Sequence, residues 1–136
     1  MANNFQNMSM LIVDDEALTR TVHEFTLRHS GFTKLQMAEN GMQAIQLCQS
    51  GEHYVIITMD FSMPLINGVR LATKLLREKG ADSLIVGVSA DGDPPLMEKF
   101  IKAGADRFYS KPLTPEKIAT FFQNIQSITQ WKSKAL

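Results

Sequence analysis

The stretch YVIITMD, residues 54–60, is an apolar run that ends on an aspartate. Short runs of this kind, rich in β-branched side chains, are typical of strands buried on both faces of a parallel sheet. A carboxylate at the end of such a strand is costly to bury unless a partner or a bound ion compensates its charge. Asp60 therefore indicates a functional site at the end of this strand.

The rest of the chain alternates strand-like runs with segments of helical spacing. Glycines follow several helical segments, as expected after helix C-termini, and Thr114–Pro115 resembles a helix N-cap followed by proline. This alternation predicts an α/β fold, with a five-stranded parallel sheet covered by helices on both faces. The expected strands are Met10–Val13, Thr33–Met37, Tyr54–Met59, Leu84–Val88 and Arg107–Tyr109.

Apolar residues recur at helical spacing in the segments between these strands. In the first segment Leu18, Val22 and Phe25 are spaced by four and three residues. His23 and His29, on the same segment, are expected at its surface or boundary. In later segments the stripes comprise Leu71 and Leu75, then Ile118, Phe121, Phe122, Ile125 and Ile128.

The composition excludes several classes of protein. Fourteen basic and fourteen acidic residues among 136 give no net charge that would favour nucleic acid or an anionic membrane. The single cysteine, Cys48, excludes an internal disulfide framework and suits a reducing compartment. There is no signal-peptide pattern, and no apolar run approaches the roughly 20 residues that span a bilayer. We expect a cytoplasmic protein; in a eukaryote a nuclear location is an additional expectation.

Acidic residues also follow the first expected strand, in MLIVDDE at residues 10–16. The carboxyl ends of parallel strands share one edge of a sheet, so Asp14 and Asp15 converge with Asp60 if the two strands are neighbours. Two carboxylates about 4 Å apart repel by roughly 4 kcal/mol at an effective dielectric of 20. A hard dication relieves that repulsion, and few oxygen ligands with retained waters favour Mg²⁺.

Two more polar groups end the fourth and fifth expected strands. The fourth strand, within SLIVGVSA (residues 83–90), ends on Ser89, and the fifth, within RFYSKPLT (residues 107–114), ends on Lys111 before Pro112. Carboxylates, a hydroxyl and an amine at one edge suit phosphoryl transfer, because cations neutralise the phosphoryl oxygens while a carboxylate acts as nucleophile.

Together these stretches resemble the receiver domain of two-component response regulators. The resemblance covers about residues 8–128, with tails at 1–7 and 129–136, and implies a doubly wound, flavodoxin-like sheet of strand order 2-1-3-4-5. The motifs that carry it are LIVDDE (11–16), ITMDFSMPLINGVRLA (57–72), IVGVSA (85–90) and AGADRFYSKPLT (103–114).

The resemblance implies a set of metal ligands around a phosphoacceptor. Asp60 would take a phosphoryl group from a phosphohistidine on a partner protein. Asp15 would bind Mg²⁺ directly and Asp14 partly through water, and Mn²⁺ is an alternative ion. The backbone carbonyl of Ser62 would be a further ligand.

The resemblance also implies roles for the groups that respond to phosphorylation. Lys111 would pair with Asp60 and then with its phosphate, and the hydroxyl of Ser89 would bond a phosphoryl oxygen. Phe108 takes the place of the switch aromatic, with core packing as the alternative interpretation. Pro112 completes the Lys-Pro step of the family.

The partner implied by the resemblance is a histidine kinase or a histidine-containing phosphotransfer protein. The long motif around Asp60 looks more like plant and hybrid-kinase receivers than the bacterial chemotaxis type. The chain would be a stand-alone receiver or a piece of a hybrid kinase, and a monomer or weak dimer. It would switch conformation, or drain phosphate from its donor as a phosphohistidine phosphatase, with its own phosphorylation and dephosphorylation dependent on Mg²⁺.

Three other classes of protein remain as alternatives. A binding-only pseudo-receiver would lack the acceptor, a metal acid or the lysine, and all three residue types are present. A haloacid-dehalogenase-type phosphatase spaces its two aspartates by one residue, whereas Asp14 and Asp15 are adjacent. A flavodoxin-like FMN protein needs a Ser/Thr/Gly phosphate loop after the first strand, where the acids of this chain would repel the phosphate.

Overall fold

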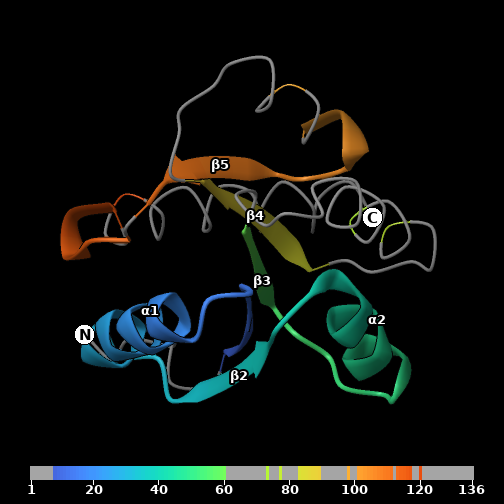
Figure 1. Cartoon of the computed structure of the whole chain (residues 1–136), viewed down its shortest axis with the longest axis horizontal. Helices are drawn as coiled ribbons and strands as arrows, with labels where there is room; N and C mark the ends of the chain where they lie inside the picture. Colours follow the sequence, from blue (N-terminus) through green and yellow to red (C-terminus); the bar gives the residue numbers. More distant parts are fainter. Residues whose placement is uncertain are drawn as a thin grey trace.

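The strands lie side by side in one parallel sheet, in the order β2-β1-β3-β4-β5 (Figure 1). The computed structural model describes residues 8–60, 83–89, 101–111 and 113–117, together with Thr73, Arg77, Glu98 and Thr120. The predicted fold class and strand order are confirmed, and each strand begins and ends within two residues of its predicted bounds. The strands are β1 Ser9–Val13, β2 Lys34–Ala38, β3 Ile56–Asp60, β4 Leu84–Ser89 and β5 Arg107–Ser110.

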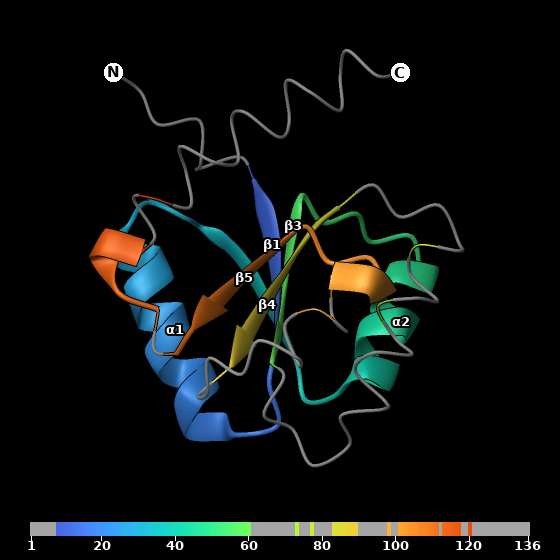
Figure 2. The same cartoon turned by 90° about the horizontal axis from the view of Figure 1, so that it is seen from above.

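Two helices cover opposite faces of this sheet, α1 (Ala17–His29) on one and α2 (Gly41–Gln49) on the other (Figure 2). Gly31 and Gly51 follow them with φ of 109° and 97°, conformations that glycine adopts without strain. The predicted cap is also confirmed, because Thr114 Oγ1 accepts the N–H of Lys117 at 3.2 Å.

The strands divide their side chains between two apolar clusters, one on each face of the sheet. Met10 and Ile12 of β1 belong to one cluster, and Leu11 and Val13 belong to the other, as the two-residue period of a strand requires. Leu27 of α1 joins the first cluster, whereas α2 closes the second. Each large aliphatic side chain buried in this way stabilises the fold by about 1.5–3 kcal/mol.

The predicted first helical segment is confirmed as α1, but the apolar residues whose spacing indicated it are exposed. Leu18, Val22 and Phe25 are 76%, 44% and 66% exposed, whereas His23 and Leu27 are 2% and 0% exposed. The helix turns its His23–Leu27 side to the sheet because Leu27 fits the core and the imidazole of His23 accepts a backbone N–H. Neither property is visible in hydrophobic spacing. The expectation that His23 lies at the surface or boundary is therefore wrong.

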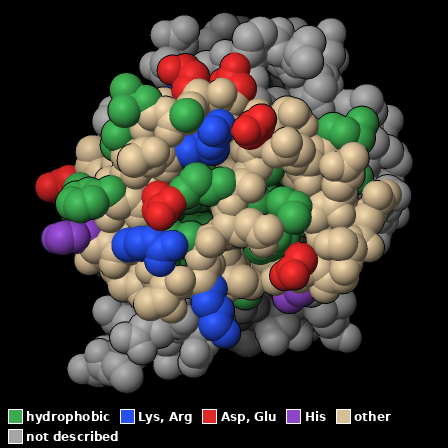
Figure 3. All heavy atoms as spheres, turned by 60° about the horizontal axis from the view of Figure 1, so that its bottom comes forward, with side chains coloured by type: hydrophobic (Ala, Val, Ile, Leu, Met, Phe, Trp, Pro, Cys, Tyr) green, Lys and Arg blue, Asp and Glu red, His purple; other side chains and the backbone are tan. Residues whose placement is uncertain are grey.

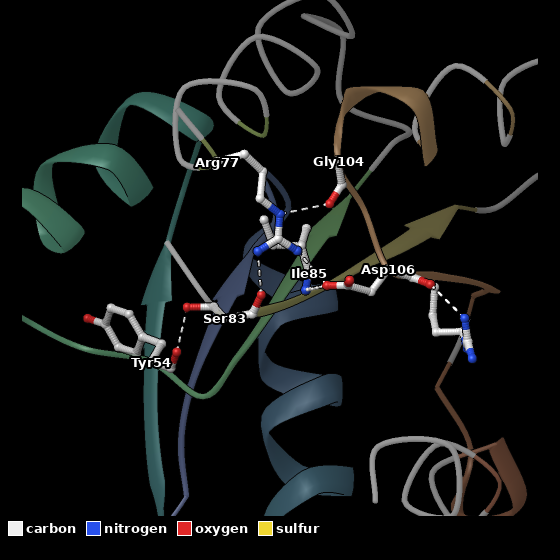
Figure 4. A network of polar contacts seen from close by, with 7 residues as sticks. Tyr54, Arg77, Ser83, Ile85, Gly104 and Asp106 are labelled. Atoms are coloured by element: carbon white, nitrogen blue, oxygen red, sulfur yellow. Dashed lines mark hydrogen bonds and ion pairs between the residues drawn. The ribbon is translucent and has the colours of Figure 1, made fainter. Parts of the chain in front are cut away.

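A polar network joins the amino-terminal ends of β3, β4 and β5, with Ser83 Oγ donating to the carbonyl of Tyr54 just before β3 (Figure 4). The guanidinium of Arg77 donates to the carbonyls of Gly104 at 2.9 Å and Ser83 at 2.8 Å, and it forms an ion pair with Asp106. Gly104 has φ of 123°, and a Cβ atom there would lie 2.7 Å from Cγ of Arg77. Glycine is thus required both by the turn and by the arginine that packs on it.

The predicted stripes around Leu71 and Leu75 and in the last helical segment lie outside the described residues. Among the residues that are described, no helix is both long and apolar enough to cross a membrane.

Candidate functional site

Five of the predicted site residues meet at the carboxyl edge of the sheet, with Asp15 next to Asp14 in the sequence. Asp14 directly follows β1, Asp60 and Ser89 are the last residues of β3 and β4, and Lys111 directly follows β5. Asp14, Asp60 and Ser89 are buried, at 1%, 2% and 2% exposure. Parallel pairing of β1 with β3 and of β3 with β4 sets these side chains next to one another.

The ammonium group of Lys111 lies between the two buried carboxylates. Its Nζ is 2.8 Å from Oδ1 of Asp60 and 3.1 Å from Oδ2 of Asp14. Burial by itself lowers the pKa of Lys111, but the hydrogen bonds and charges of Asp60 and Asp14 outweigh it, so the pKa lies above its usual 10.5. A raised lysine pKa stabilises the fold fully below pH 10.5 and loses that contribution only as the pH rises through the folded value. The lysine is therefore charged at neutral pH.

The acids at this edge form a cluster that could hold a metal ion. Carboxylate oxygens of Asp14, Asp15 and Asp60 lie within 4.8 Å of one another. Two of these residues are buried and Asp15 is exposed, so an ion would have both fixed ligands and an open side toward water. Three carboxylates and one ammonium group leave an excess of negative charge in the cluster. The donor set, all oxygen and all anionic, fits a hard dication.

Backbone contacts hold the residues of the cluster in place. Oδ1 of Asp14 accepts the N–H of Glu16 at 2.9 Å, and Arg20 of α1 donates to the carbonyl of Asp14 at 2.7 Å. On the other side, the N–H of Lys111 donates to the carbonyl of Ser89 at 2.7 Å. Asp14 is thus tied to Glu16 and to Arg20 of α1, and the backbone of Lys111 is tied to the end of β4.

The remaining predicted residues are only partly visible. Phe108 lies on β5, half-buried against the apolar cluster that includes Leu11 and Val13. Ser62 and Pro112 lie outside the described residues. The predicted roles of all these residues remain predictions, because the structure gives positions rather than reactions.

Sequence reasoning missed the contacts of two α1 residues, Arg20 and His23, with segments that carry site residues. Arg20 contacts the backbone of Asp14, as described above. His23 Nε2 accepts the N–H of Leu113 at 3.4 Å, across 90 positions of sequence. A signal was present, since His23 and Leu27 are four residues apart and share a helix face, but it was weaker than the apolar stripe beside it.

Comparison with known proteins identifies the family. The family model described as the response regulator receiver domain matches residues 10–123. The chain belongs to this family. Two-component response regulator 24 of Arabidopsis thaliana is 35% identical over 123 residues, which are 90% of this chain and 87% of that protein. Two-component response regulator ORR41 of Oryza sativa subsp. japonica is 40% identical over 111 residues, 80% of this chain and 87% of the relative.

Solved structures agree with the fold of this receiver domain. The chemotaxis protein CheY4 of Vibrio cholerae superposes with a TM-score of 0.76 and 22% identity, covering 87% of this chain and 98% of that one. At that identity the likeness supports the flavodoxin-like arrangement of the sheet and helices alone. The relatives named as two-component response regulators support the signalling class, and none of the three alternatives raised from sequence is favoured.

The receiver domain also exposes apolar side chains on α1. Leu18, Val22 and Phe25 are the exposed members, and the ring of Phe25 stacks on His29 with centroids 5.1 Å apart. Figure 3 shows hydrophobic side chains beside a histidine on the left of the molecule, the side on which α1 lies in Figure 1. The helix begins two residues after Asp15, so Leu18 is the member of this apolar surface that lies nearest the candidate site along the helix.

Proposed function

We propose that the protein accepts a phosphoryl group on Asp60 from a phosphohistidine of a histidine kinase or phosphotransfer protein, in a relay that acts in the cytoplasm. The observation that carries the proposal is the position of Lys111 Nζ, 2.8 Å from Asp60 and 3.1 Å from Asp14, beside a cluster of three acids. A buried carboxylate that is paired with a lysine and belongs to a cluster of acids able to hold a metal ion is poised for attack at phosphorus.

The reaction is a displacement at phosphorus. A carboxylate oxygen of Asp60 forms the new P–O bond while the P–N bond to the partner's imidazole breaks, and the ring leaves as neutral histidine after protonation. Lys111 stays beside the acceptor and pairs with the phosphoryl oxygens that replace the carboxylate charge. Ser89, the last residue of the neighbouring strand, supplies a hydroxyl that donates to the same group.

The acids would hold Mg²⁺, with Asp15, Asp14 and Asp60 as carboxylate ligands and the backbone carbonyl of Ser62 as a predicted further one. Mg²⁺, when bound, neutralises charge on the phosphoryl oxygens and relieves the repulsion among the acids. Phosphorylation would then shift the protein between two conformations through contacts of Ser89 and Phe108 that form in only one of them.

A donor protein must bring its phosphohistidine to the edge where Asp60 lies. The exposed apolar side chains of α1 extend from Leu18, in the first turn after the acids, to Phe25. A partner that covers Leu18, Val22 and Phe25 removes them from water. The same helix therefore serves both the partner surface and, through Arg20, the backbone of Asp14.

The proposal is tested by intact mass spectrometry after incubation with Mg²⁺ and a small acyl-phosphate donor. We expect one added phosphoryl group, mapped by fragmentation to the peptide that contains Asp60, and none when Mg²⁺ is chelated. Transfer from a phosphorylated histidine phosphotransfer protein should give the same adduct. If neither donor gives an adduct and beryllofluoride with Mg²⁺ leaves the spectra of the protein unchanged, a binding-only pseudo-receiver becomes the better account.

Metal binding gives a separate prediction that needs no donor. Mg²⁺ at about 100 times its Kd should stabilise the folded protein by about 2.7 kcal/mol. Asp15→Asn should weaken Mg²⁺ binding by about an order of magnitude or more, because it removes an anionic ligand of the cluster. The measurement is the unfolding temperature as a function of Mg²⁺ concentration.

Glu16→Gln is the matched control for this titration. It loses the same charge one residue away, from a side chain outside the three-acid cluster. Its Mg²⁺ response should equal that of the native protein. If Mg²⁺ binding is weakened equally in both variants, the ion binds through the general negative charge of the region rather than through the three-acid cluster.

A further inference from the structure

His23 is a buried polar residue that the proposed reaction does not use. It lies on α1 with 2% exposure, and its Nε2 accepts the backbone N–H of Leu113 at 3.4 Å. Leu113 is itself 8% exposed and belongs to the apolar cluster that contains Leu27. The imidazole therefore attaches α1 to the segment that follows β5.

That segment starts with Lys111, two residues before Leu113. The N–H of Lys111 is already held by the carbonyl of Ser89 at 2.7 Å. His23 contacts the same segment two residues further on, through Leu113. The segment is thus attached to β4 at Lys111 and to α1 at Leu113, and the side chain of Lys111 reaches Asp60 and Asp14 from a segment held at both points.

We propose that His23 is a positioning residue, whose imidazole fixes the segment after β5 and so holds the Lys111 ammonium group between Asp14 and Asp60. The inference rests on the proposed function, in which Lys111 serves phosphoryl transfer to Asp60. His23 touches none of the reacting atoms and acts through the backbone of Leu113.

The contact requires a neutral imidazole, because Nε2 can accept a hydrogen bond only while it carries no proton. Burial lowers the pKa of His23; among the described groups, the charge of Asp14 raises it and that of Lys111 lowers it. A histidine whose folded pKa is depressed contributes its full stability above the unfolded value of about 6.5, and loses it as the pH falls below that value. Acid should therefore release the segment and loosen Lys111.

The test measures the initial rate of phosphorylation by a small acyl phosphate in Mg²⁺, as a function of pH, for the native protein and for three variants. His23→Leu keeps an apolar filling but removes the acceptor, and should slow the reaction about fivefold at neutral pH, the equivalent of one hydrogen bond of about 1 kcal/mol. His23→Gln offers an oxygen near the position of Nε2 and should restore most of the rate. His29→Gln, which changes an exposed imidazole on the same helix, should match the native protein.

The pH profile separates positioning from mere packing. The native protein and His29→Gln should lose rate as acid protonates His23, whereas His23→Gln should lack that step. A native rate in His23→Leu, or an unchanged acid step in His23→Gln, would overturn the proposal. If His23→Leu does not fold, the comparison of His23→Gln with the native protein still decides.

A second readout does not depend on phosphorylation. In the native protein the amide resonance of Leu113 should shift with pH in step with the ring of His23, and this shift should disappear in His23→Gln. If the amide resonance of Leu113 does not change when the ring of His23 titrates, the proposed contact is contradicted. If this coupling is present but no variant takes up phosphate, the proposed function has failed rather than the link from His23 to Leu113.

Discussion

Asp60→Asn will take up no phosphoryl group from an acyl phosphate, and in the absence of a dication it will unfold at a higher temperature than the native protein. The amide oxygen is too weak a nucleophile to form the P–O bond, so the loss of phosphorylation should be complete. The gain in stability has a separate cause. It comes from removing one of the acids that lie within 4.8 Å of one another.

The size of the stability gain is set by two opposing changes. Carboxylates about 4 Å apart repel by roughly 4 kcal/mol at an effective dielectric of 20, and the substitution removes Asp60 from that cluster. It also removes the 2.8 Å ion pair with Lys111, but Lys111 keeps Asp14 at 3.1 Å. We expect a net gain of about 1–2 kcal/mol, which raises the unfolding temperature by several degrees for a chain of this size.

The measurements are intact mass after phosphorylation and thermal unfolding in a chelator. Glu16→Gln, with the same loss of charge outside the cluster, should be phosphorylated normally and should gain little stability. In saturating Mg²⁺ the advantage of Asp60→Asn should shrink, because the native cluster then gains a counter-ion. Phosphate on Asp60→Asn would identify another acceptor, and a lower unfolding temperature in chelator would show that the Lys111 pair outweighs the repulsion.

The site residues at the strand ends could be predicted from the sequence. Asp14, Asp60, Ser89 and Lys111 stand directly at or after apolar strand-like runs, and parallel topology carries all such positions to one edge. The order of the strands was therefore enough to predict that these side chains meet. It did not matter how far apart they are along the chain.

The orientation of α1 could not be predicted in the same way. An apolar stripe specifies a face but not the partner that covers it, and Leu18, Val22 and Phe25 are exposed although their spacing is helical. The face that packs on the sheet contains His23, which is tolerated there because a backbone N–H from Leu113 reaches its ring. Such a pairing, 90 positions apart, leaves no local pattern.

The same limit applies to the network at the opposite edge of the sheet, where Arg77 and Asp106 are 29 positions apart. Arg77→Met should destabilise the fold by about 3 kcal/mol, a large part of the marginal stability of a single domain. Methionine keeps most of the apolar stem but removes every donor. The carbonyls of Ser83 and Gly104 and the carboxylate of Asp106 would then lose a guanidinium that all three now share.

A double-mutant cycle isolates the ion pair within that loss. Asp106→Asn keeps an oxygen that can accept the N–H of Ile85, a contact of 2.9 Å in the native protein, while it removes the charge. Coupling of about 1–2 kcal/mol between Arg77→Met and Asp106→Asn is expected in urea unfolding, because the two groups are in contact and only 22% and 20% exposed. Lys102→Met is the matched control, since its pair with Glu98 is 74% and 67% exposed and should contribute less than about 0.5 kcal/mol.

The position of Arg77 also predicts how fast Arg77→Met should be phosphorylated. The network ties the amino-terminal ends of β3, β4 and β5 (Figure 4). Asp60 and Lys111, in contrast, lie at the carboxyl ends of β3 and β5. Arg77→Met should therefore be phosphorylated at a native rate under conditions in which it remains folded. A variant that is fully folded but slow to take up phosphate would show that the two edges are coupled through the sheet, and that Arg77 holds the strand ends in register for the reaction rather than only holding them together.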